Sequence, residues 1–442
     1  MESVLLYVLG ILIVLVGLAL SIGLHEVGHL LPAKKFGVRV SQYMIGFGPT
    51  VLSFRRGETQ YGIKALPLGG YISMAGMFPP RRPGGRSRTA TTSIFDTLVQ
   101  DARQLSADTL VDVDESRAFY RLPVPKRIII MLGGPVMNLL LGVLLYAIVL
   151  CGFGIPQLST TIGRVNECVI PASSSSQECA PGDAASPALA AGIEPGDRIV
   201  SIDGQAIEEW TQATEIIRES PGEELTFVVE RGGSDVTLRA VPLLSERYAT
   251  TATGEIAEDA DGNPITEEVG FLGIGPATVN VQQPVTAVLP AVGDNVVRVV
   301  QIVITLPQRL VDIAIAAFGP EERDPNGPIG VVGIGRIAGE VTSLSAAPVA
   351  DRAATLVQLL ASLNIALFVF NLIPLLPLDG GHVAGALWEA IRRKFAALRG
   401  KPDPGPVDTA RFIPVTLVVS IILAGMTLLL AYADIVKPIS IL

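Results

Sequence analysis

The sequence predicts a polytopic α-helical membrane protein with four transmembrane helices, a membrane-associated β-hairpin region and an extracytoplasmic α+β domain. The 442 residues have a mean hydropathy of +0.49 and only 17% of them are charged, which is too apolar for an ordinary soluble enzyme. A formal net charge of −9 argues against a nucleic-acid binder, whose surface would be basic. Three cysteines are too few for a disulfide-built scaffold or a cysteine-rich zinc module.

Four uncharged stretches are each long enough to cross a bilayer, which takes roughly 20 residues in a helix. They comprise residues 3–24, 128–153, 353–378 and 412–433. The first stretch differs from a cleavable signal peptide because it is too long, begins with Glu2 and no basic residue, and precedes no small-residue cleavage site. We therefore expect it to remain as an anchor.

The charges of the connecting segments predict the orientation of these spans. Residues 30–127 contain 15 basic and 7 acidic residues, whereas residues 154–352 contain 11 basic and 28 acidic residues. Residues 379–411 contain 6 basic and 4 acidic residues. Because basic loops stay on the cytoplasmic side, we expect the first and third of these segments inside, and the second segment and both termini outside.

The inner segment between the first two spans has two parts. Residues 36–78 alternate short β-type runs with glycine turns, which favours hairpins over helix. Residues 79–120 are rich in proline, glycine, arginine, serine and threonine and contain few large apolar residues. This composition is typical of a flexible linker, and we assign it no fold.

The outer segment begins with a predicted compact domain at residues 157–246. Within it, LAAGIEPGDRIVSIDGQAIEEW combines a small-residue helix end, a glycine- and proline-containing turn, an alternating strand and a tight Asp203-Gly204 hairpin turn. The region resembles a circularly permuted bacterial PDZ domain, a fold that binds an extended peptide by adding it to a sheet edge. The sequence does not decide between peptide binding and simple obstruction of bulky ectodomains.

Three further features lie on this outer side. Cys168 and Cys179 flank a serine-rich loop and could form a bridge in an oxidising compartment, whereas Cys151 is expected to be an apolar filler. Residues 247–350 begin with an acidic loop. They continue at residues 296–318 with an apolar run. Charged residues and a proline interrupt this run, which favours an amphipathic helix on the outer membrane face over a fifth span.

The motif His25-Glu26-Val27-Gly28-His29 stands at the end of the first span. Histidines at i and i+4 share one helical face and can reach a single Zn²⁺, and Glu26 between them is placed to polarise a water. Ionisable groups in a span cost at least about 2.5 kcal/mol each and persist mainly where function or pairing offsets that cost. The alternative, two histidines that merely cap a helix at the interface, lacks such an offset.

A catalytic zinc takes three protein ligands, and the candidate for the third is Asp379 at the inner end of the third span. The first and third spans both run inward, so the two ends fall at similar depth. Pro374 and Pro377 interrupt the third span there and leave carbonyls to be satisfied by protein or water. Asn371 could bond a substrate backbone or simply cap the broken helix, and His382 is not needed as a ligand.

These motifs together resemble the site-2 protease family, and within it the bacterial regulator of sigma-E protease group with a single PDZ domain, as in actinobacteria. The likeness rests on HEVGH, GFGP, YGIKALPLGGY, LGGPVMN and NLIPLLPLDGGH, together with the inserted PDZ-like domain. It implies that His25, His29 and Asp379 bind one catalytic Zn²⁺ and that Glu26 is the general base.

The resemblance also implies how substrate is held. The region of Gly69, Gly70 and Tyr71 would form a re-entrant β-hairpin whose edge pairs with the unwound substrate helix, and Asn371 would help to hold the substrate. A transmembrane helix hides its amides in its own hydrogen bonds, so unwinding and replacement partners are needed. Gly133, Gly134 and Asn138 of the LGGPVMN stretch would let the second span approach its neighbours closely, and packing alone accounts for the two glycines.

The expected function is therefore an intramembrane zinc endopeptidase of a bacterial inner membrane, with its active site near the cytoplasmic side. By resemblance, substrates are single-span anti-sigma factors already trimmed by an upstream site-1 protease, with remnant signal peptides as a second class. Two alternatives from other classes are a catalytically inert PDZ adapter and a metal or ion transporter. Neither requires a glutamate between two histidines.

The expected organisation follows from these assignments. Its segments, in chain order, are 1–35 (first span with the histidine motif), 36–78 (re-entrant hairpin region), 79–120 (linker), 121–156 (second span), 157–246 (PDZ-like domain), 247–350 (acidic loop and amphipathic helix), 351–384 (third span with Asp379) and 385–442 (cytoplasmic link and fourth span).

Overall fold

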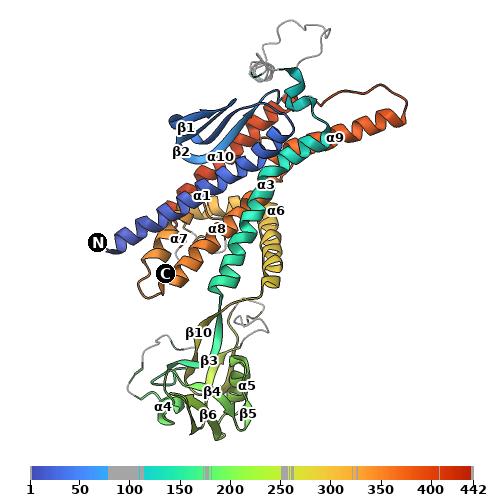
Figure 1. The fold of residues 1–442 in the computed structure, drawn as a ribbon. Helices are drawn as coiled ribbons and strands as arrows, with labels where there is room; N and C mark the ends of the chain where they lie inside the picture. Colours follow the sequence, from blue (N-terminus) through green and yellow to red (C-terminus); the bar gives the residue numbers. More distant parts are fainter. Residues whose placement is uncertain are drawn as a thin grey trace. The chain divides into compact units, whose positions relative to one another are not determined.

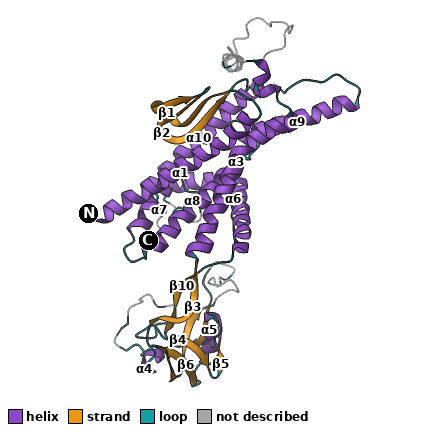
Figure 2. Cartoon of the chain, in the orientation of Figure 1, coloured by secondary structure: helices purple, strands orange, loops and turns teal. Residues whose placement is uncertain are grey.

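The computed structural model of the chain describes residues 2–77, 109, 114–172, 174, 179–180, 182–249, 257, 259, 263–320, 322–324, 327–407 and 409–439. Most of the expected linker at 79–120 lies outside these residues. The chain forms two compact units, shown in Figures 1 and 2. The helical unit combines Met1–Phe153 with Pro284–Leu442, and the β-rich unit is Gly154–Gln283.

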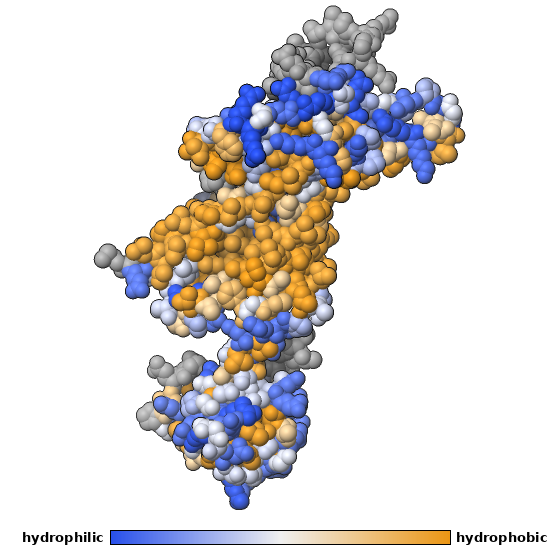
Figure 3. All heavy atoms as spheres, viewed as in Figure 1, coloured by the Kyte–Doolittle hydropathy of each residue, from blue (hydrophilic) through white to orange (hydrophobic). Residues whose placement is uncertain are grey.

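Within its described part, the helical unit contains five helices that are long and apolar enough to cross a membrane, one more than the four expected. They are α1 (Glu2–Lys35), α3 (Val124–Ala147, continued by a π-helical turn to Phe153), α6 (Val288–Phe318), α8 (Val349–Asn371) and α10 (Ile413–Val436). Their outward faces are strongly apolar, as Figure 3 shows for the side of the unit that it presents.

The additional candidate is α6, where we expected an amphipathic surface helix. Near its start, the Asn295 side chain donates a hydrogen bond to the Tyr146 hydroxyl (2.7 Å), which lies in the last turn of α3. Near its end, Ile313 packs against Leu430 and Ala433 in the last turns of α10. Both halves of α6 therefore contact the C-terminal ends of other helices.

Two shorter α-helices also lie in the described part of this unit. The first, α7 (Val331–Ser343), packs against the N-terminal half of α1, where Gly10 lies against Ala338 and Thr342 without room for a side chain. The second, α9 (Asp379–Leu398), begins after the turns that end α8 at Asn371. We expected only a short link after the third span. The apolar stretch 353–378 thus ends as a helix seven residues early, at the point where its prolines begin.

The expected hairpin region is an antiparallel pair, β1 (Val40–Arg56) and β2 (Thr59–Met74). Both strands bend near their middle, so the pairing produces four adjacent segments in the order 70–74, 40–45, 59–64 and 50–56. Positive φ angles at Gly46 and Gly69 accompany these bends, and few residues other than glycine adopt them. Segment 70–74 therefore lies at one edge of the sheet.

The β-rich unit is built on an antiparallel sheet in the order β10-β3-β4-β6-β7, with β5 paired to β4. The strands are β3 (Ile155–Val165), β4 (Arg198–Ile202), β5 (Gln205–Ala206), β6 (Leu225–Arg231), β7 (Ser234–Ala240) and β10 (Ile274–Val281), with a separate pair β8 (Leu243–Tyr248) and β9 (Thr266–Phe271). The described part of the unit also contains helices α4 (Pro187–Ala190) and α5 (Trp210–Glu219). Since β10 pairs with β3, the unit extends beyond residue 246, where we expected the domain to end.

The core and loops of this unit follow its sequence pattern. Inward residues such as Ile199, Phe227 and Val229 are fully buried and form one apolar cluster around α5. The Asp203-Gly204 turn has positive φ at both residues, as a tight hairpin requires. Cys168 and Cys179 form a disulfide, which answers a question that the sequence left open.

Candidate active site

The histidine motif lies in the last third of α1, which continues as one helix to Lys35. His25 and His29 are four residues apart, so both rings leave the same side of the helix, and their ring centroids are 4.8 Å apart. Both histidines and Glu26 are buried. The helix alone therefore brings two imidazole nitrogens together in the interior of the unit.

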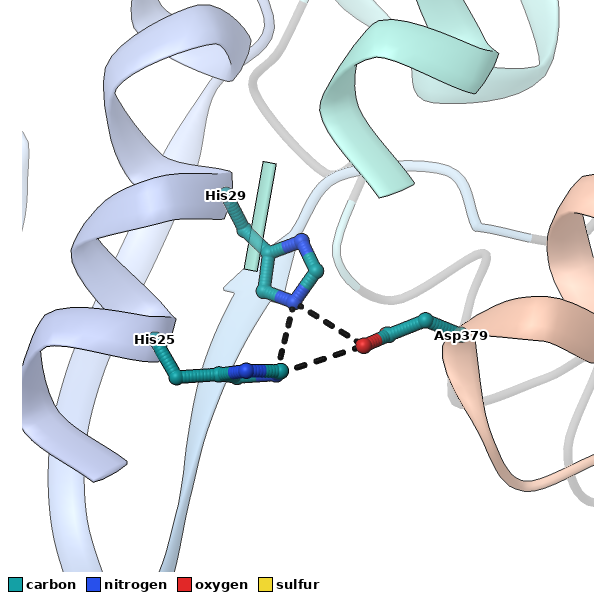
Figure 4. A group of neighbouring side chains, drawn as sticks. All are labelled: His25, His29 and Asp379. Atoms are coloured by element: carbon teal, nitrogen blue, oxygen red, sulfur yellow. Dashed lines mark hydrogen bonds and ion pairs between the residues drawn. The ribbon is translucent and has the colours of Figure 1, made fainter. Parts of the chain in front are cut away.

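Asp379, the first residue of α9, approaches these nitrogens from a different part of the chain (Figure 4). Its Oδ2 atom lies 3.2 Å from Nε2 of His25 and 3.4 Å from Nε2 of His29. Two glycines make this position possible. A Cβ on Gly380 would stand 2.4 Å from backbone oxygens of the preceding turns, and one on Gly381 would stand 2.5 Å from the Leu376 nitrogen.

These three side chains fit a tetrahedral metal ion. Ligand atoms held at about 2.0–2.1 Å from a tetrahedral zinc stand about 3.3–3.4 Å apart. The corresponding separations are 3.1 Å between the two Nε2 atoms and 3.2 and 3.4 Å to the carboxylate. In addition, the buried Oδ2 atom of Asp379 has no hydrogen-bond partner among the described residues. A cation at the centre of this triangle would satisfy it.

Residues of helix α3 contact the Nδ1 atoms of both imidazole rings. Nδ1 of His29 lies 2.8 Å from the carbonyl oxygen of Ile130, so its N–H can donate there and leave Nε2 free as a ligand. The Asn138 side-chain amide lies 3.2 Å from Nδ1 of His25. Its buried Oδ1 atom has no partner, and rotation of the amide would let that oxygen accept the Nδ1 proton of a metal-binding His25.

Glycines allow α1 and α3 to pack closely and leave space beside the histidine rings. A Cβ on Gly28 would stand 2.2 Å from the Gly133 carbonyl oxygen, so the two backbones touch at this crossing. At the next residue of α3, a Cβ on Gly134 would stand 2.2 Å from Nε2 of His29 and 2.7 Å from Nε2 of His25. We attributed these glycines to packing, but Gly134 also keeps the space beside the ligand nitrogens empty.

A cavity of ≈ 470 Å³ opens beside this centre and is lined mainly by apolar side chains of α1, α7 and α8. Glu26 and His25 line it, as do Gly69, Gly70 and Asn371 from the predicted substrate-binding set. The fourth member of that set, Tyr71, does not line it, and its hydroxyl bonds instead to Gln42 at 3.2 Å. The Asn371 amide donates to the carbonyl of Leu367, one turn back on its own helix (3.0 Å).

Sequence reasoning missed the parts of the site that act through α3. The Ile130 carbonyl carries no side-chain signal at all. Asn138 does carry one, because a polar residue inside an apolar span tends to face a partner within the bundle. His382 lies one turn beyond Asp379 and lines a separate small cavity with Arg127 and Glu389.

Comparisons with known proteins show the family to which the chain belongs. Residues 13–402 match the model of Peptidase family M50. The chain is 33% identical to zinc metalloprotease Rip1 of Mycobacterium tuberculosis strain H37Rv, over 98% of this chain and 99% of that protein. It is also 33% identical to Rip1 of Mycolicibacterium smegmatis, over 98% of each chain. Metalloprotease MmpA of Caulobacter vibrioides is 28% identical, over 87% of this chain and 89% of that protein.

The match to the family model covers most of the chain, and the Rip1 matches extend over nearly all of it. These relatives are named as metalloproteases, which favours an enzyme over the adapter and the transporter. The apolar helices fit a membrane protein, and the group of His25, His29 and Asp379 could hold the zinc ion. The chain belongs to peptidase family M50, and it is an intramembrane zinc metalloprotease of the site-2 protease type.

Proposed function

We propose that His25, His29 and Asp379 hold the zinc ion and that Glu26 is the general base in hydrolysis of a peptide bond within or next to a transmembrane helix. The observation that carries the proposal is the convergence of three ligand atoms, each within 3.4 Å of the other two, beside an apolar cavity that His25 lines. When bound, zinc supplies Lewis acidity, which lowers the pKa of a water and stabilises negative charge on a carbonyl oxygen.

The protein's own groups perform the remaining steps. Glu26 faces the cavity beside His25, so its carboxylate can take a proton from the attacking water and return it to the leaving amine. The Ile130 carbonyl and Asn138 hold the two imidazoles in their ligand orientation. The apolar walls limit the water around the reacting bond, which strengthens every electrostatic contact at the centre.

We propose that substrate pairs with segment 70–74 of β2. On its free side, no strand of the described residues pairs with this segment. Gly70 lies directly against Glu26, because a Cβ there would stand 3.0 Å from Cγ of the glutamate. An extended substrate added to this edge would replace its lost helical hydrogen bonds with strand hydrogen bonds, and its backbone would pass the general base. Asn371, which also lines the cavity, would bind the same segment.

We propose four spans in a bacterial inner membrane, with both termini outside and the zinc centre near the cytoplasmic face. The basic residues on either side of the hairpin region support this orientation. Under it, α3 and α10 both end on the outer side, and α6 contacts those ends with both of its halves. We therefore assign α6 to the outer side of the bundle as a surface helix.

We propose that the substrates are single-span proteins such as anti-sigma factors that an upstream site-1 protease has already trimmed, with remnant signal peptides as a second class. The β-rich unit would act as a PDZ domain that binds or excludes the outer part of a substrate. Its position in the chain, between the second span and α6, supports a role on the outer side.

The function is tested with purified full-length protein and a single-span substrate in liposomes, with the cut located by mass spectrometry. Glu26→Gln is expected to bind zinc normally and to lower the cleavage rate by about 10²–10⁴-fold, the usual contribution of a general base. Glu340→Gln is the matched control, since Glu340 is as buried as Glu26 but lies away from the cavity lining. Equal rates for the wild type and Glu26→Gln, or a cut outside the membrane segment, would contradict the proposal.

A further inference from the structure

A buried ion pair links α3 to α9 at a distance from the zinc ligands. Nη2 of Arg127, in the first turn of α3, donates to Oε1 of Glu389 at 2.5 Å. The Glu389 side chain is 0% exposed and that of Arg127 is 8% exposed. Glu389 also accepts a hydrogen bond from the Val407 amide (3.0 Å) and pairs with Arg393 (3.0 Å). Both oxygens of its carboxylate therefore have partners.

Arg127 stands at one end of a stripe of residues on α3. On α3, Arg127, Ile130, Gly134 and Asn138 follow one another at helical spacing, and the last three contact or adjoin the histidines. On α9, Glu389 follows Asp379 by ten residues, about 2.8 turns, so the two side chains leave the same helix roughly 80° apart around its axis. Helix α3 is consequently the common support for both histidines and, through Arg127, for the helix that carries Asp379.

The geometry points to Arg127 and Glu389 as positioning residues for the zinc centre. We infer that their ion pair fixes how far α9 is shifted along α3 and thereby holds the Asp379 carboxylate at the distance that a metal ion needs. Neither residue touches the ligand atoms. The inference rests on the zinc ligands proposed above, and it does not depend on the proposed substrates.

Energetics favour a positioning role over a purely stabilising one. Removing two charges from water costs free energy that a buried pair often only just recovers, so a well-packed apolar pair is frequently as stable. An apolar pair has no directional hydrogen bond, so it allows one helix to shift along the other by a fraction of an ångström. At a metal site, substitution of the residues that orient the ligands typically weakens metal binding by about 10–100-fold.

The test replaces the pair by apolar residues in the full-length protein, as Arg127→Met with Glu389→Leu. Zinc affinity is measured by competition with a chromophoric chelator, ligand geometry by the visible spectrum of the cobalt-substituted protein, and folding by thermal unfolding. We expect an unfolding midpoint close to that of the wild type, zinc affinity about tenfold weaker, and a shifted cobalt spectrum.

The matched control is the second buried ion pair of the helical unit, between Arg323 and Asp434 (2.9 Å, with side chains 3% and 1% exposed). It joins the segment before α7 to α10, and among the described residues the two side chains form their other hydrogen bonds with Pro328 and Gly333 rather than with α3 or α9. Arg323→Met with Asp434→Leu should leave zinc affinity and the cobalt spectrum as in the wild type. Equal zinc affinity in both double variants and the wild type would overturn the inference, and so would an equal loss in both.

If the first double variant fails to fold, Glu389→Gln decides the question. Glutamine has the same shape and can still accept the Val407 hydrogen bond, but it removes the charge that holds Arg127. We expect weaker zinc binding that the reversed pair, Arg127→Glu with Glu389→Arg, partly restores. Wild-type zinc affinity in Glu389→Gln would overturn the inference.

Discussion

The two units of this protein distribute apolar and polar residues in opposite ways. In the helical unit, large apolar side chains point outward, with Leu5, Ile304 and Leu428 each 72% exposed, while Asn138 and Asn364 are buried. In the β-rich unit, Phe227 and its apolar neighbours are inside, and the described charged residues other than Asp197 are at least partly exposed. The difference follows from the surroundings, since lipid removes the penalty for an apolar exterior.

The comparison shows that different residues specify the two interiors. Burial of apolar area drives the β-rich unit together. In the helical unit, small residues and polar contacts select the helix pairs: Gly28 against Gly133, and Asn364, whose amide donates to the Ser21 hydroxyl at 2.9 Å. Substitution of a glycine should therefore be the severe change in the helical unit. In the β-rich unit, the severe change should be truncation of a large apolar residue.

The largest effect is expected for Gly134→Ala in the helical unit. The added methyl group would stand 2.2 Å from Nε2 of His29, which the Ile130 hydrogen bond prevents from moving freely. We expect loss of stoichiometric zinc and a fall in cleavage of more than about 10⁴-fold, ~5.5 kcal/mol. Metal analysis and the liposome assay measure both. Gly425→Ala, where a Cβ meets no atom within 4 Å, should behave as wild type, and zinc retained in Gly134→Ala would contradict the steric argument.

Phe227→Ala makes the opposite change in the β-rich unit. Truncation of this fully buried ring leaves a cavity and should destabilise the unit by about 3–5 kcal/mol. The fluorescence of Trp210, which packs against this core, reports unfolding in full-length protein once Trp388→Phe has removed the second tryptophan. Zinc content should not change. A parallel loss of zinc would show that the two units do not keep separate interiors.

A smaller, pH-dependent effect is expected for Asp197→Asn. The buried Asp197 carboxylate accepts two hydrogen bonds from Arg231 (both 2.7 Å) and one from the Glu194 amide (3.0 Å). Chiefly the Arg231 hydrogen bonds hold the pKa of Asp197 below its usual range. The unfolded chain therefore binds this proton more readily, so the stabilisation is complete above about pH 4 and disappears as the pH falls further.

We expect Asp197→Asn to cost roughly 1–2 kcal/mol of unfolding free energy at pH 7, because Arg231 is about one-third exposed and water can solvate it. The wild type and the variant should converge below about pH 4. Urea unfolding followed through Trp210 at several pH values measures this difference. A constant difference between pH 7 and pH 3 would show that the carboxylate charge contributes nothing.

The smallest effect is expected for Gly335→Leu in the active-site cavity. Gly335 lines the cavity on α7, and a Cβ there would lie 4.0 Å from the nearest atom, on Ile11, so a leucine fits and occupies the space. Substrates with bulky apolar residues in the cleaved segment should lose about tenfold in kcat/KM, ~1.4 kcal/mol, relative to alanine-rich ones. Gly293→Leu, which lies on α6 outside the lining, should not discriminate. Uniform loss across substrates would argue against a specificity role.

The sequence predicts those features that depend on local patterns. Uncharged runs predicted four of the five long apolar helices, glycine turns predicted the hairpin region, and the spacing of His25 and His29 predicted a shared helical face. The proposal of Asp379 required only that two spans end at the same depth. Each of these signals lies within one short segment or follows from charge counts.

The features that sequence reasoning missed depend on contacts between distant segments. Pairing of β10 with β3 extends the β-rich unit past residue 246, and no pattern near residue 274 reveals its partner strand. Arg127 appeared to be one more basic residue beside a span, although it is buried against Glu389. The Ile130 carbonyl that orients His29 has no side-chain signature. Only the folded arrangement shows these roles.

Zinc K-edge X-ray absorption of the purified protein tests the central claim most directly, with Asp379→Ala as the comparison. For the wild type we predict two imidazole nitrogens and a carboxylate oxygen at about 2.0–2.1 Å, and for the variant the loss of that oxygen together with weaker zinc binding. Identical spectra and identical zinc affinity for the two proteins would contradict a centre built from α1 and α9.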